Sequence, residues 1–243
     1  MRTIVVIPVY NDAQFLQSCL EYITKQTLAP DKIIIVDNNC TDNSASIATR
    51  HESVVVITEP TQGICVATKT GLNKALDMGA DIILRCDADS MPPQEWIEKS
   101  VNNLRQDQVV ATTGPGIFYD IPSVLRPLAS ILYMKAYFWS VGLALGQKPL
   151  FGSNFAIKSS AWREIKNSNH LNLQDVHDDI DISYHLSTIG TIKYDEMLIM
   201  PISGRPFKSL TGMLKRYKIG LKSIIIHWPE QSPWRRFMQN RLK

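Results

Sequence analysis

The chain has 243 residues, of which 44% are hydrophobic and 20% are charged, and these are globular proportions, ample for a buried core. Its four cysteines form no Cys-x-x-Cys pair, which argues against a zinc site and favours a reducing compartment. The formal net charge is +3, but residues 205–243 hold ten Lys or Arg and a single acid, Glu230, so the basic end is a separate feature.

Neither a signal peptide nor a membrane-spanning helix is predicted. The apolar run at 4–8 is too short for a signal peptide, and no cleavage-like site follows it. The best candidate for a spanning helix, 128–145, is interrupted by Lys135, and nowhere are 18 consecutive residues apolar. We therefore expect a cytoplasmic protein.

Strand and helix patterns alternate over the first 115 residues. Short apolar runs predict buried strands at 4–7, 32–36, 54–57 and 82–84. Helical patterns lie between them, at 13–26, from the predicted N-cap Thr41 to residue 50, and after Gly63. Because continuous apolar strands separated by helices are typical of a parallel sheet covered on both faces, we expect an α/β fold with a mostly parallel central sheet.

Helices and strands also alternate after Pro92-Pro93. The predicted helices span 94–104, 123–145, 176–190 and 208–226, with a short one from Ser160. The predicted strands span 109–113, 151–158, 192–194 and 198–202. Neither the Gly-x-Gly-x-x-Gly signature of dinucleotide-binding proteins nor the Walker A loop of P-loop proteins occurs.

Two carboxylates follow the fourth predicted strand, in the triplet Asp87-Ala88-Asp89. Open α/β sheets bind ligands at the carboxyl ends of their strands. Carboxylates at that edge suit Mg²⁺ or Mn²⁺, hard cations that proteins often hold with one or two carboxylates and substrate phosphates. A second acidic cluster, Asp178, Asp179 and Asp181, opens the helix predicted at 176–190, where the helix dipole alone would also favour acids.

The chain carries six motifs in a fixed order. The first four are Pro8-Val9-Tyr10-Asn11, the run 36–44 that starts Val-Asp-Asn-Asn, Gly63 with Ala67 and Gly71, and Asp87-Ala88-Asp89 with Pro92. The last two are Gly152-Ser153-Asn154 and an Asp-Asp-x-Asp block at 178–181, which is followed by Gly-x-Ile-x-Tyr-Asp at 190–195. In this order and spacing they resemble the family-2 glycosyltransferases, inverting sugar-transferring enzymes with the GT-A fold, a Rossmann-like nucleotide-diphospho-sugar transferase fold. The resemblance covers roughly residues 3–205.

The resemblance implies a nucleotide pocket at the strand ends. Asp37 would accept a hydrogen bond from a base N–H group. Thr68 and Lys69 stand where the family often has Arg-Asn, so the usual arginine is missing and Lys69 is the candidate for the base or phosphates. The other residues implied to bind the nucleotide are Pro8, Val9, Tyr10, Asn11, Asp87 and Ala88.

The resemblance also implies a metal site and a catalytic base. Asp89 would coordinate the metal, Mn²⁺ or Mg²⁺, that bridges the diphosphate, and Asp87 would face the ribose and the metal. Asp179 matches the second acid of the family's Glu-Asp pair, the catalytic base, and Asp178 takes the place of the glutamate. Asn154 would touch the donor sugar, with a structural amide in a turn as the alternative.

The reaction chemistry agrees with two carboxylate sites. An acceptor hydroxyl that attacks the anomeric carbon must lose a proton, and a nearby carboxylate can act as its general base. The leaving nucleoside diphosphate gains negative charge, which a divalent cation stabilises. We expect a metal-dependent, inverting, hexosyltransferase-type enzyme that uses a UDP-, GDP- or dTDP-sugar and a glycan or lipid-linked acceptor, in cell-envelope polysaccharide or glycolipid assembly.

Two alternatives stay open. A sugar nucleotidyltransferase also combines a Rossmann-like sheet with metal-binding carboxylates, but its glycine-rich basic loop after the first strand is missing here. A non-catalytic protein that binds nucleotide sugars could keep the same fold, although the presence of Asp89 and Asp179 counts against it. The basic end shows no nucleic-acid-binding module, so no nucleic acid is expected as a partner.

The resemblance and the charge divide the chain into a GT-A domain, 1–206, and a basic amphipathic extension, 207–243. Within the domain, 1–115 is the expected nucleotide-sugar half and 116–206 the acceptor half. Along the helix predicted at 208–226, apolar residues recur at helical spacing and lysines gather on another side. Such a helix suits peripheral attachment to an anionic membrane surface, at the inner face of the cell membrane, and packing against the domain is the alternative. The apolar residues are Leu210, Met213, Leu214, Tyr217, Leu221, Ile224 and Ile225.

Overall fold

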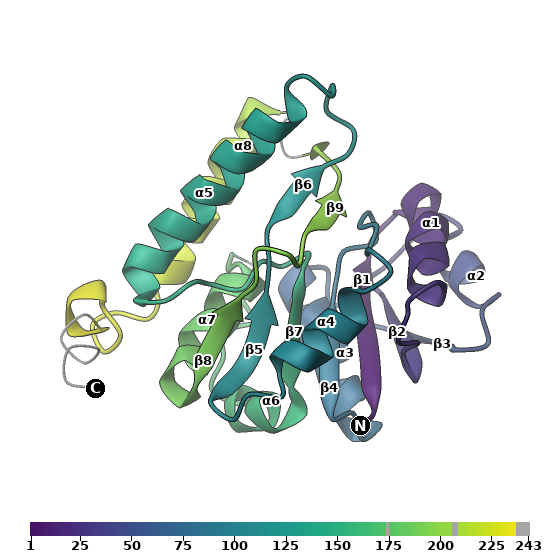
Figure 1. Ribbon diagram of the computed structural model, residues 1–243, viewed down its shortest axis with the longest axis horizontal. Helices are drawn as coiled ribbons and strands as arrows, with labels where there is room; N and C mark the ends of the chain where they lie inside the picture. Colours follow the sequence, from purple (N-terminus) through teal and green to yellow (C-terminus); the bar gives the residue numbers. More distant parts are fainter. Residues whose placement is uncertain (174, 206–208, 237–243) are drawn as a thin grey trace.

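The computed structural model describes residues 1–173, 175–205 and 209–236. Its centre is a seven-stranded sheet in the order β3-β2-β1-β4-β7-β5-β8 (Figure 1). All neighbouring pairs are parallel except those of β7, which runs antiparallel to β4 and β5. The expectation of a mostly parallel α/β sheet is therefore confirmed. The strands are β1 (Thr3–Val9), β2 (Lys32–Asp37), β3 (Val54–Thr58), β4 (Ile82–Arg85), β5 (Val109–Thr113), β7 (Phe155–Lys158) and β8 (Thr191–Tyr194).

Helices cover both faces of the sheet (Figure 1). One face carries α1 (Ala13–Thr24), α2 (Ser44–Ala48) and α4 (Trp96–Asn103), and the other carries α3 (Ile64–Asp77), α6 (Ser159–Ile165) and α7 (Asp178–Ile189). In β1, Val5 and Ile7 belong to the core on the first face, and Ile4 and Val6 to the core on the second. Successive side chains of a strand point to opposite faces, so a sheet buried on both sides requires the continuous apolar runs seen in the sequence.

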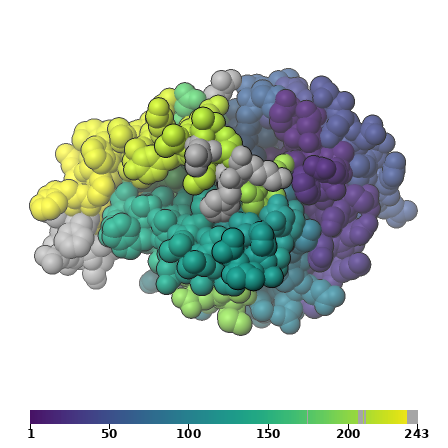
Figure 2. All heavy atoms as spheres, turned by 90° about the horizontal axis from the view of Figure 1, so that it is seen from above, coloured from purple at the N-terminus to yellow at the C-terminus, as the bar shows by residue number. Residues whose placement is uncertain are grey.

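A second layer stands over one end of the sheet (Figure 1). It contains the short parallel pair β6 (Gly116–Phe118) and β9 (Met200–Ile202), and the helices α5 (Arg126–Leu145) and α8 (Leu210–Ile225). The two helices lie side by side in both views (Figures 1 and 2). Residues of α5, α7 and α8 share one apolar cluster, so the described part of the predicted extension packs against the domain. That cluster comprises Val141, Leu145, Ile180 and Tyr184, with Tyr137 and Ile224 at its edge.

Gly71 lets α3 approach the sheet closely. A Cβ atom at this position would lie 2.3 Å from a methyl group of Val6 and 2.8 Å from one of Val36. Any larger residue would push α3 away from β1 and β2. The glycine spacing of the sequence motif therefore reflects packing of this helix on the strands that lead to the site.

Two predicted boundaries were wrong. Thr41 is not the N-cap of α2: the helix starts at Ser44 after Asn43, while the Thr41 N–H donates to Asn11 Oδ1 at 2.7 Å. The strand predicted from residue 151 begins at Phe155, because 151–154 form a tight turn with only one isolated bridge. In addition, β6 was not predicted, since three residues are too few to show a strand pattern.

The exclusion of a spanning helix on account of Lys135 was too strict. By length and composition alone, α5 is long and apolar enough to cross a membrane, with a mean hydropathy of 1.4. A third of that segment is buried inside the protein. A core helix of a soluble protein meets the same two criteria.

Candidate active site

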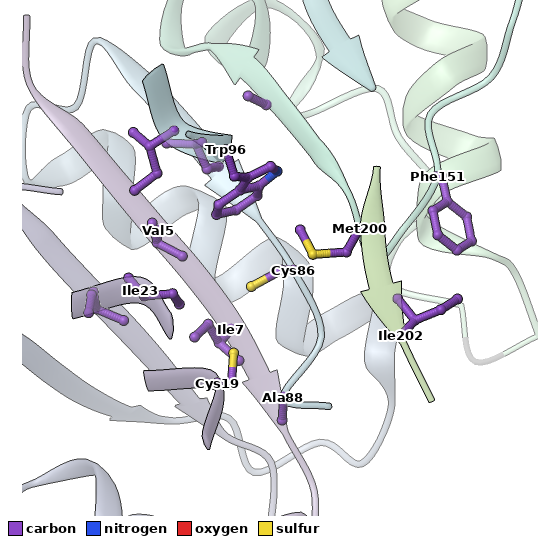
Figure 3. Close-up of a cluster of buried hydrophobic side chains, with 14 of the residues drawn as sticks. Val5, Ile7, Cys19, Ile23, Cys86, Ala88, Trp96, Phe151, Met200 and Ile202 are labelled. Carbon is purple, nitrogen blue, oxygen red and sulfur yellow. The ribbon is translucent and has the colours of Figure 1, made fainter. Parts of the chain in front are cut away.

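The triplet 87–89 leaves β4 at the carboxyl end of the sheet. Ala88 is 1% exposed and points into the core beside Ile7 and Cys19 (Figure 3). A small apolar residue between the two acids therefore anchors the loop. Asp87 and Asp89 flank this anchor, and their carboxylates reach separate polar networks.

Asp89 is paired with Arg205. The guanidinium donates to Asp89 Oδ2 from Nε at 2.9 Å and from Nη2 at 2.5 Å, and its Nη1 donates to Asp12 Oδ1 at 2.5 Å. Arg205 also lies over the ring of Phe15, 5.0 Å from its centre. Three segments that are far apart in sequence thus meet at one charge cluster.

The surroundings of Asp89 disfavour its negative charge. Burial, and then the charge of Asp87, raise the pKa of Asp89 to about 6, although Arg205 acts in the opposite direction. The nearby Tyr119 hydroxyl has its pKa raised to about 12, by burial and then by Asp89. An acidic pair that is this crowded binds positive charge favourably, and its hard oxygen ligands fit Mg²⁺ or Mn²⁺.

Asp87 is connected to the second acidic cluster through Arg85. Arg85 is 2% exposed and contacts Asp87 Oδ1 at 2.8 Å through Nη1, and Asp178 Oδ2 at 3.2 Å through Nη2. The Ser153 hydroxyl donates to Asp87 Oδ2 at 2.5 Å, and the Thr68 hydroxyl donates to Asp178 Oδ2 at 2.7 Å. One buried cation therefore links the end of β4 to the start of α7.

Asp179 is held from several sides. Its Oδ2 accepts from the Gly152 N–H at 2.9 Å and from the Tyr137 hydroxyl at 3.0 Å, and its Oδ1 accepts from the Ile180 N–H at 2.8 Å. Gly152 permits this approach, since a Cβ there would lie 3.3 Å from Asp179 Oδ2 and 3.1 Å from Arg85 Nη1. The contacts fix one orientation of the Asp179 carboxyl group.

The pKa of Asp179 is raised, first by burial and then by the charge of Asp178. The Gly152 N–H and the Tyr137 hydroxyl act against this shift. A raised pKa brings a carboxylate closer to the range in which a general base works well at neutral pH. Asp178 and Asp179 are only 5% and 8% exposed, so exposure does not separate their roles.

The loop after β2 forms the other side of this edge. Asp37 Oδ1 accepts from the Cys40 N–H at 2.8 Å, and Asn11 Oδ1 accepts from the Thr41 N–H, which ties the loops after β1 and β2 together. Asn11 adopts a positive φ of 52°, and the neighbouring Tyr10 is 52% exposed. These side chains sit at the carboxyl ends of β1 and β2, where the sequence predicts the nucleotide.

Four residues predicted to contact the donor have other partners or are buried. Asn154 is wholly buried, and its amide accepts from Trp96 Nε1 at 2.8 Å and donates to the Leu198 carbonyl at 2.6 Å, which is the geometry of the structural alternative, and its contact with the donor sugar stays a prediction. Pro8 is buried, and Val9 is 1% exposed within the core, so their side chains do not line an open pocket. Lys69 Nζ donates to Asn172 Oδ1 at 3.1 Å, and its nucleotide role stays a prediction.

Sequence reasoning missed three residues of this region: Arg205, Arg85 and Asn38. Arg205 lacks a local signal because its carboxylate partners come from other segments, and the link that Arg85 makes from the nearby Asp87 to Asp178 likewise depends on a distant segment. Asn38 lies within a quoted motif, where it bonds the Glu59 and Thr61 carbonyls at 2.9 and 2.6 Å and the Gly63 N–H at 2.8 Å. It thereby fixes the entry to α3.

Known proteins share both the sequence pattern and the fold. The family described as glycosyl transferase family 2 matches residues 4–162, which is more than half of the chain. The chain belongs to this family. The sequence resemblance is therefore confirmed, and the fold is the α/β GT-A fold, as the solved structures below also show.

The curated relatives match over part of their length. Glycosyltransferase AglE of Haloferax volcanii is 34% identical over 107 residues, or 41% of this chain and 34% of the relative. Undecaprenyl-phosphate 4-deoxy-4-formamido-L-arabinose transferase of Serratia proteamaculans is 34% identical over 106 residues, which is 40% of this chain and 32% of the relative. UDP-N-acetylglucosamine--dolichyl-phosphate N-acetylglucosaminyltransferase of Methanococcus voltae is 27% identical over 129 residues, which is 46% of this chain and 51% of the relative. The matched segment thus spans about half or less of each of these relatives.

Solved structures match over most of the chain. The mannosyltransferase PcManGT of Pyrobaculum calidifontis, in complex with GDP-Man and Mn²⁺, has a TM-score of 0.70 and 18% identity, covering 92% of this chain and 64% of that one. The structure of S. aureus TarS residues 1–349 has a TM-score of 0.64 and 13% identity, and the match covers 85% of this chain and 61% of that one. At these identities the likeness concerns the fold.

Proposed function

We propose that this chain transfers a sugar, with inversion at the anomeric carbon, from a nucleoside diphosphate sugar to a hydroxyl acceptor, using Mg²⁺ or Mn²⁺. The observation that carries the proposal is the network from Asp87 through Arg85 to Asp178, beside Asp179, with the separate Asp89–Arg205 pair on the same loop after β4. Cation-binding carboxylates and a candidate base then lie at the same edge of the sheet. A direct displacement needs both.

Each acidic residue has a distinct role in this proposal. Asp89 and Asp87 would hold the divalent cation, which when bound offsets the charge that the leaving diphosphate gains. Asp179 would accept the proton of the attacking hydroxyl, with Gly152 and Tyr137 holding its carboxyl group in place. The planar guanidinium of Arg205 matches phosphate oxygens, and we assign it to the diphosphate once a cation replaces it on Asp89.

The donor is proposed to be a UDP-, GDP- or dTDP-sugar of the hexose class. Asp37 and the half-exposed Tyr10 would contact the base at the ends of β2 and β1. Complexes of fold relatives with UDP-GlcNAc, UDP and GDP-Man support a nucleoside diphosphate sugar without choosing the base. Sugar nucleotidyltransfer is the weaker alternative, because family membership favours the glycosyltransferase reaction.

A lipid-linked or glycan acceptor at the inner membrane surface is the proposed setting. Two relatives are named as transferases to undecaprenyl phosphate and dolichyl phosphate, which are lipids. Along α8, the exposed apolar side chains of Leu214, Tyr217, Leu221 and Ile225 adjoin exposed lysines, and α5 beside it exposes Trp139 among other apolar residues. Apolar and basic groups together suit an anionic lipid surface.

A thermal-shift screen tests the donor side of this proposal. The full chain is heated with UDP-, GDP- and dTDP-sugars, with and without Mn²⁺, because a ligand that binds only the folded state raises the midpoint. We expect one nucleotide class to raise the midpoint, and to do so more strongly with Mn²⁺. A donor-hydrolysis and transfer assay on the class that binds then separates an enzyme from a non-catalytic binder. No shift with any donor would contradict the proposal.

A further inference from the structure

Four metal-ligating side chains form a cluster away from the candidate active-site carboxylates. His170, Asp181, His185 and His227 each place one ligand atom within 4.8 Å of all the others. Asp181 is wholly buried, and His227 and His185 are 5% and 9% exposed. The cluster joins three segments. His170 lies in the loop before α7, Asp181 and His185 lie in α7, and His227 is the second residue after α8.

The distances around Asp181 match the edges of a coordination polyhedron. Asp181 Oδ1 lies 2.8 Å from His170 Nδ1, 3.1 Å from His227 Nε2 and 3.7 Å from His185 Nε2. In a tetrahedral zinc site with bonds of about 2.0–2.1 Å, ligand atoms lie about 3.3 Å apart. Two of these distances are slightly shorter than that value and one is longer, so a modest rearrangement of the side chains would bring all four ligand atoms into bonding range.

The tautomer of His227 supplies an independent argument. Its Nδ1 lies 2.8 Å from the Ser223 carbonyl oxygen, which only accepts, so Nδ1 carries a proton. In the neutral ring, Nε2 then presents a lone pair to the Asp181 carboxylate, and two lone pairs repel each other. The contact is favourable only with a second proton on Nε2 or with a cation between the two atoms. An Nδ1–H that donates to a backbone carbonyl is also the usual second contact of a metal-bound histidine.

His185 adds an unsatisfied nitrogen. Among the described residues its buried Nε2 has no hydrogen-bond partner, and His227 Nε2 faces the Asp181 carboxylate at 3.1 Å. The His227 ring is held in place by Tyr184, which stacks on it at 4.1 Å. A buried ring nitrogen without a partner, such as His185 Nε2, is uncommon unless something binds it.

We propose that His170, Asp181, His185 and His227 bind one divalent transition-metal ion, with Zn²⁺ the best fit, as a structural site that fastens the end of α8 to α7. Imidazole ligands favour such ions over Mg²⁺ or Ca²⁺, and four protein ligands in a buried position are typical of structural zinc sites. The missing Cys-x-x-Cys pair was interpreted as evidence against any zinc site, and that interpretation considered cysteine ligands alone. The sole local sequence signal is the i, i+4 spacing of Asp181 and His185.

Metal analysis of the full chain without an affinity tag tests this site directly. The protein is stripped with chelator, loaded with Zn²⁺ and dialysed against Mg²⁺-containing buffer. We expect one retained Zn²⁺ per chain, in wild type and in Asp89→Ala, with a shell of nitrogen and oxygen ligands at about 2.0–2.1 Å by X-ray absorption. The proposal would be overturned if the wild-type chain retained no Zn²⁺. It would also be overturned if the Asp89→Ala variant failed to retain the Zn²⁺ that wild type keeps.

Variants identify the ligands. His185→Asn and His227→Gln should each lose the retained Zn²⁺, and with it the rise in thermal midpoint that Zn²⁺ gives wild type, whereas His51→Asn outside the cluster should keep both. Circular dichroism confirms that each variant is folded, and the wild-type metal content stands as a test even if a variant is not. Full Zn²⁺ retention in both cluster variants would refute the assignment. Since the readout is metal content, it is independent of whether sugar transfer is found.

Discussion

Asp89 is the residue on which cation binding is expected to depend most. Removing its carboxylate in Asp89→Ala leaves Asp87 as the one acid of the triplet, and Arg205 keeps its contact with Asp12. We expect the Mn²⁺-dependent part of UDP or GDP binding to disappear and transfer activity to fall to background. Isothermal titration with UDP and GDP, with and without Mn²⁺, measures this. The exposed Asp77→Ala serves as a control, and Mn²⁺-enhanced binding that persists in Asp89→Ala would remove Asp89 from the metal site.

The pH dependence of Mn²⁺ binding follows from the raised pKa of Asp89. The folded chain holds this group at about 6, against an ordinary 3.8, so its contribution to stability is lost as the pH rises through about 6. Mn²⁺ binds the ionised Asp89 carboxylate, so bound Mn²⁺ restores the stability that ionisation removes. Mn²⁺ should therefore raise the thermal midpoint at pH 7.5 and have little effect at pH 5. An equal effect at both pH values would be inconsistent with Asp89 as the controlling group.

Asp179 is expected to affect turnover rather than binding. Asp179→Asn keeps the size of the side chain but cannot accept a proton, so turnover should fall by about 10²–10⁴-fold, the usual scale of general-base catalysis. Steady-state kinetics should show this loss in kcat, with nucleotide affinity little changed. Asp178→Asn is the matched comparison. If Asp178→Asn is the more damaging change, the base has been assigned to the wrong acid.

At the scale of elements, α8 has two faces with different surroundings. Ser223 is buried, and its hydroxyl accepts from the N–H of His177, the N-cap of α7, at 2.7 Å, so this face packs against the start of α7. Leu214, Tyr217 and Leu221 remain exposed on another side. The single apolar stripe predicted from the sequence is therefore divided between core packing, where Ile224 lies, and solvent. Packing against the domain is confirmed for the first part, and membrane attachment through the second part stays a prediction.

Vesicle binding tests the exposed face. Lys215→Gln with Lys218→Gln removes two exposed positive charges, and each basic residue near an anionic bilayer contributes about 1 kcal/mol, so partitioning should fall roughly 30-fold. Co-sedimentation with anionic and neutral vesicles, at low and high salt, measures it. Point substitutions are preferable to truncation, because removing α8 would also uncover α7. Charge removal that leaves partitioning unchanged, or equal binding to neutral vesicles, would count against membrane attachment.

At the scale of the whole molecule, Arg85 joins the two halves of the site. Replacing this buried cation by Met leaves Asp87 and Asp178 close together without their partner. Breaking a buried ion pair in this way typically costs about 3–5 kcal/mol. Urea denaturation should show a loss of this size for Arg85→Met, and almost none for the exposed Arg50→Met. A loss below about 1 kcal/mol would mean that Arg85 is not a structural link.

The sequence by itself determined the parts of this protein that depend on local pattern. Apolar runs such as 4–7 and 32–36 identify strands buried on both faces, and a strand followed by Asp87-Ala88-Asp89 indicates which edge of the sheet carries acidic groups. Those patterns work because strand periodicity and strand-end position are set within a few residues. The family followed from the order of such motifs, and the fold followed with it.

Only the tertiary structure decided which side chains meet. Arg205 reaches Asp89 across 116 positions, and His227 reaches Asp181 from the end of another helix, so no local pattern could reveal either pair. The structure likewise showed that Asn154, part of a motif, is fully occupied within the core. Side-chain partners are set by long-range packing, in which segments distant along the chain are brought together by burial of their apolar neighbours.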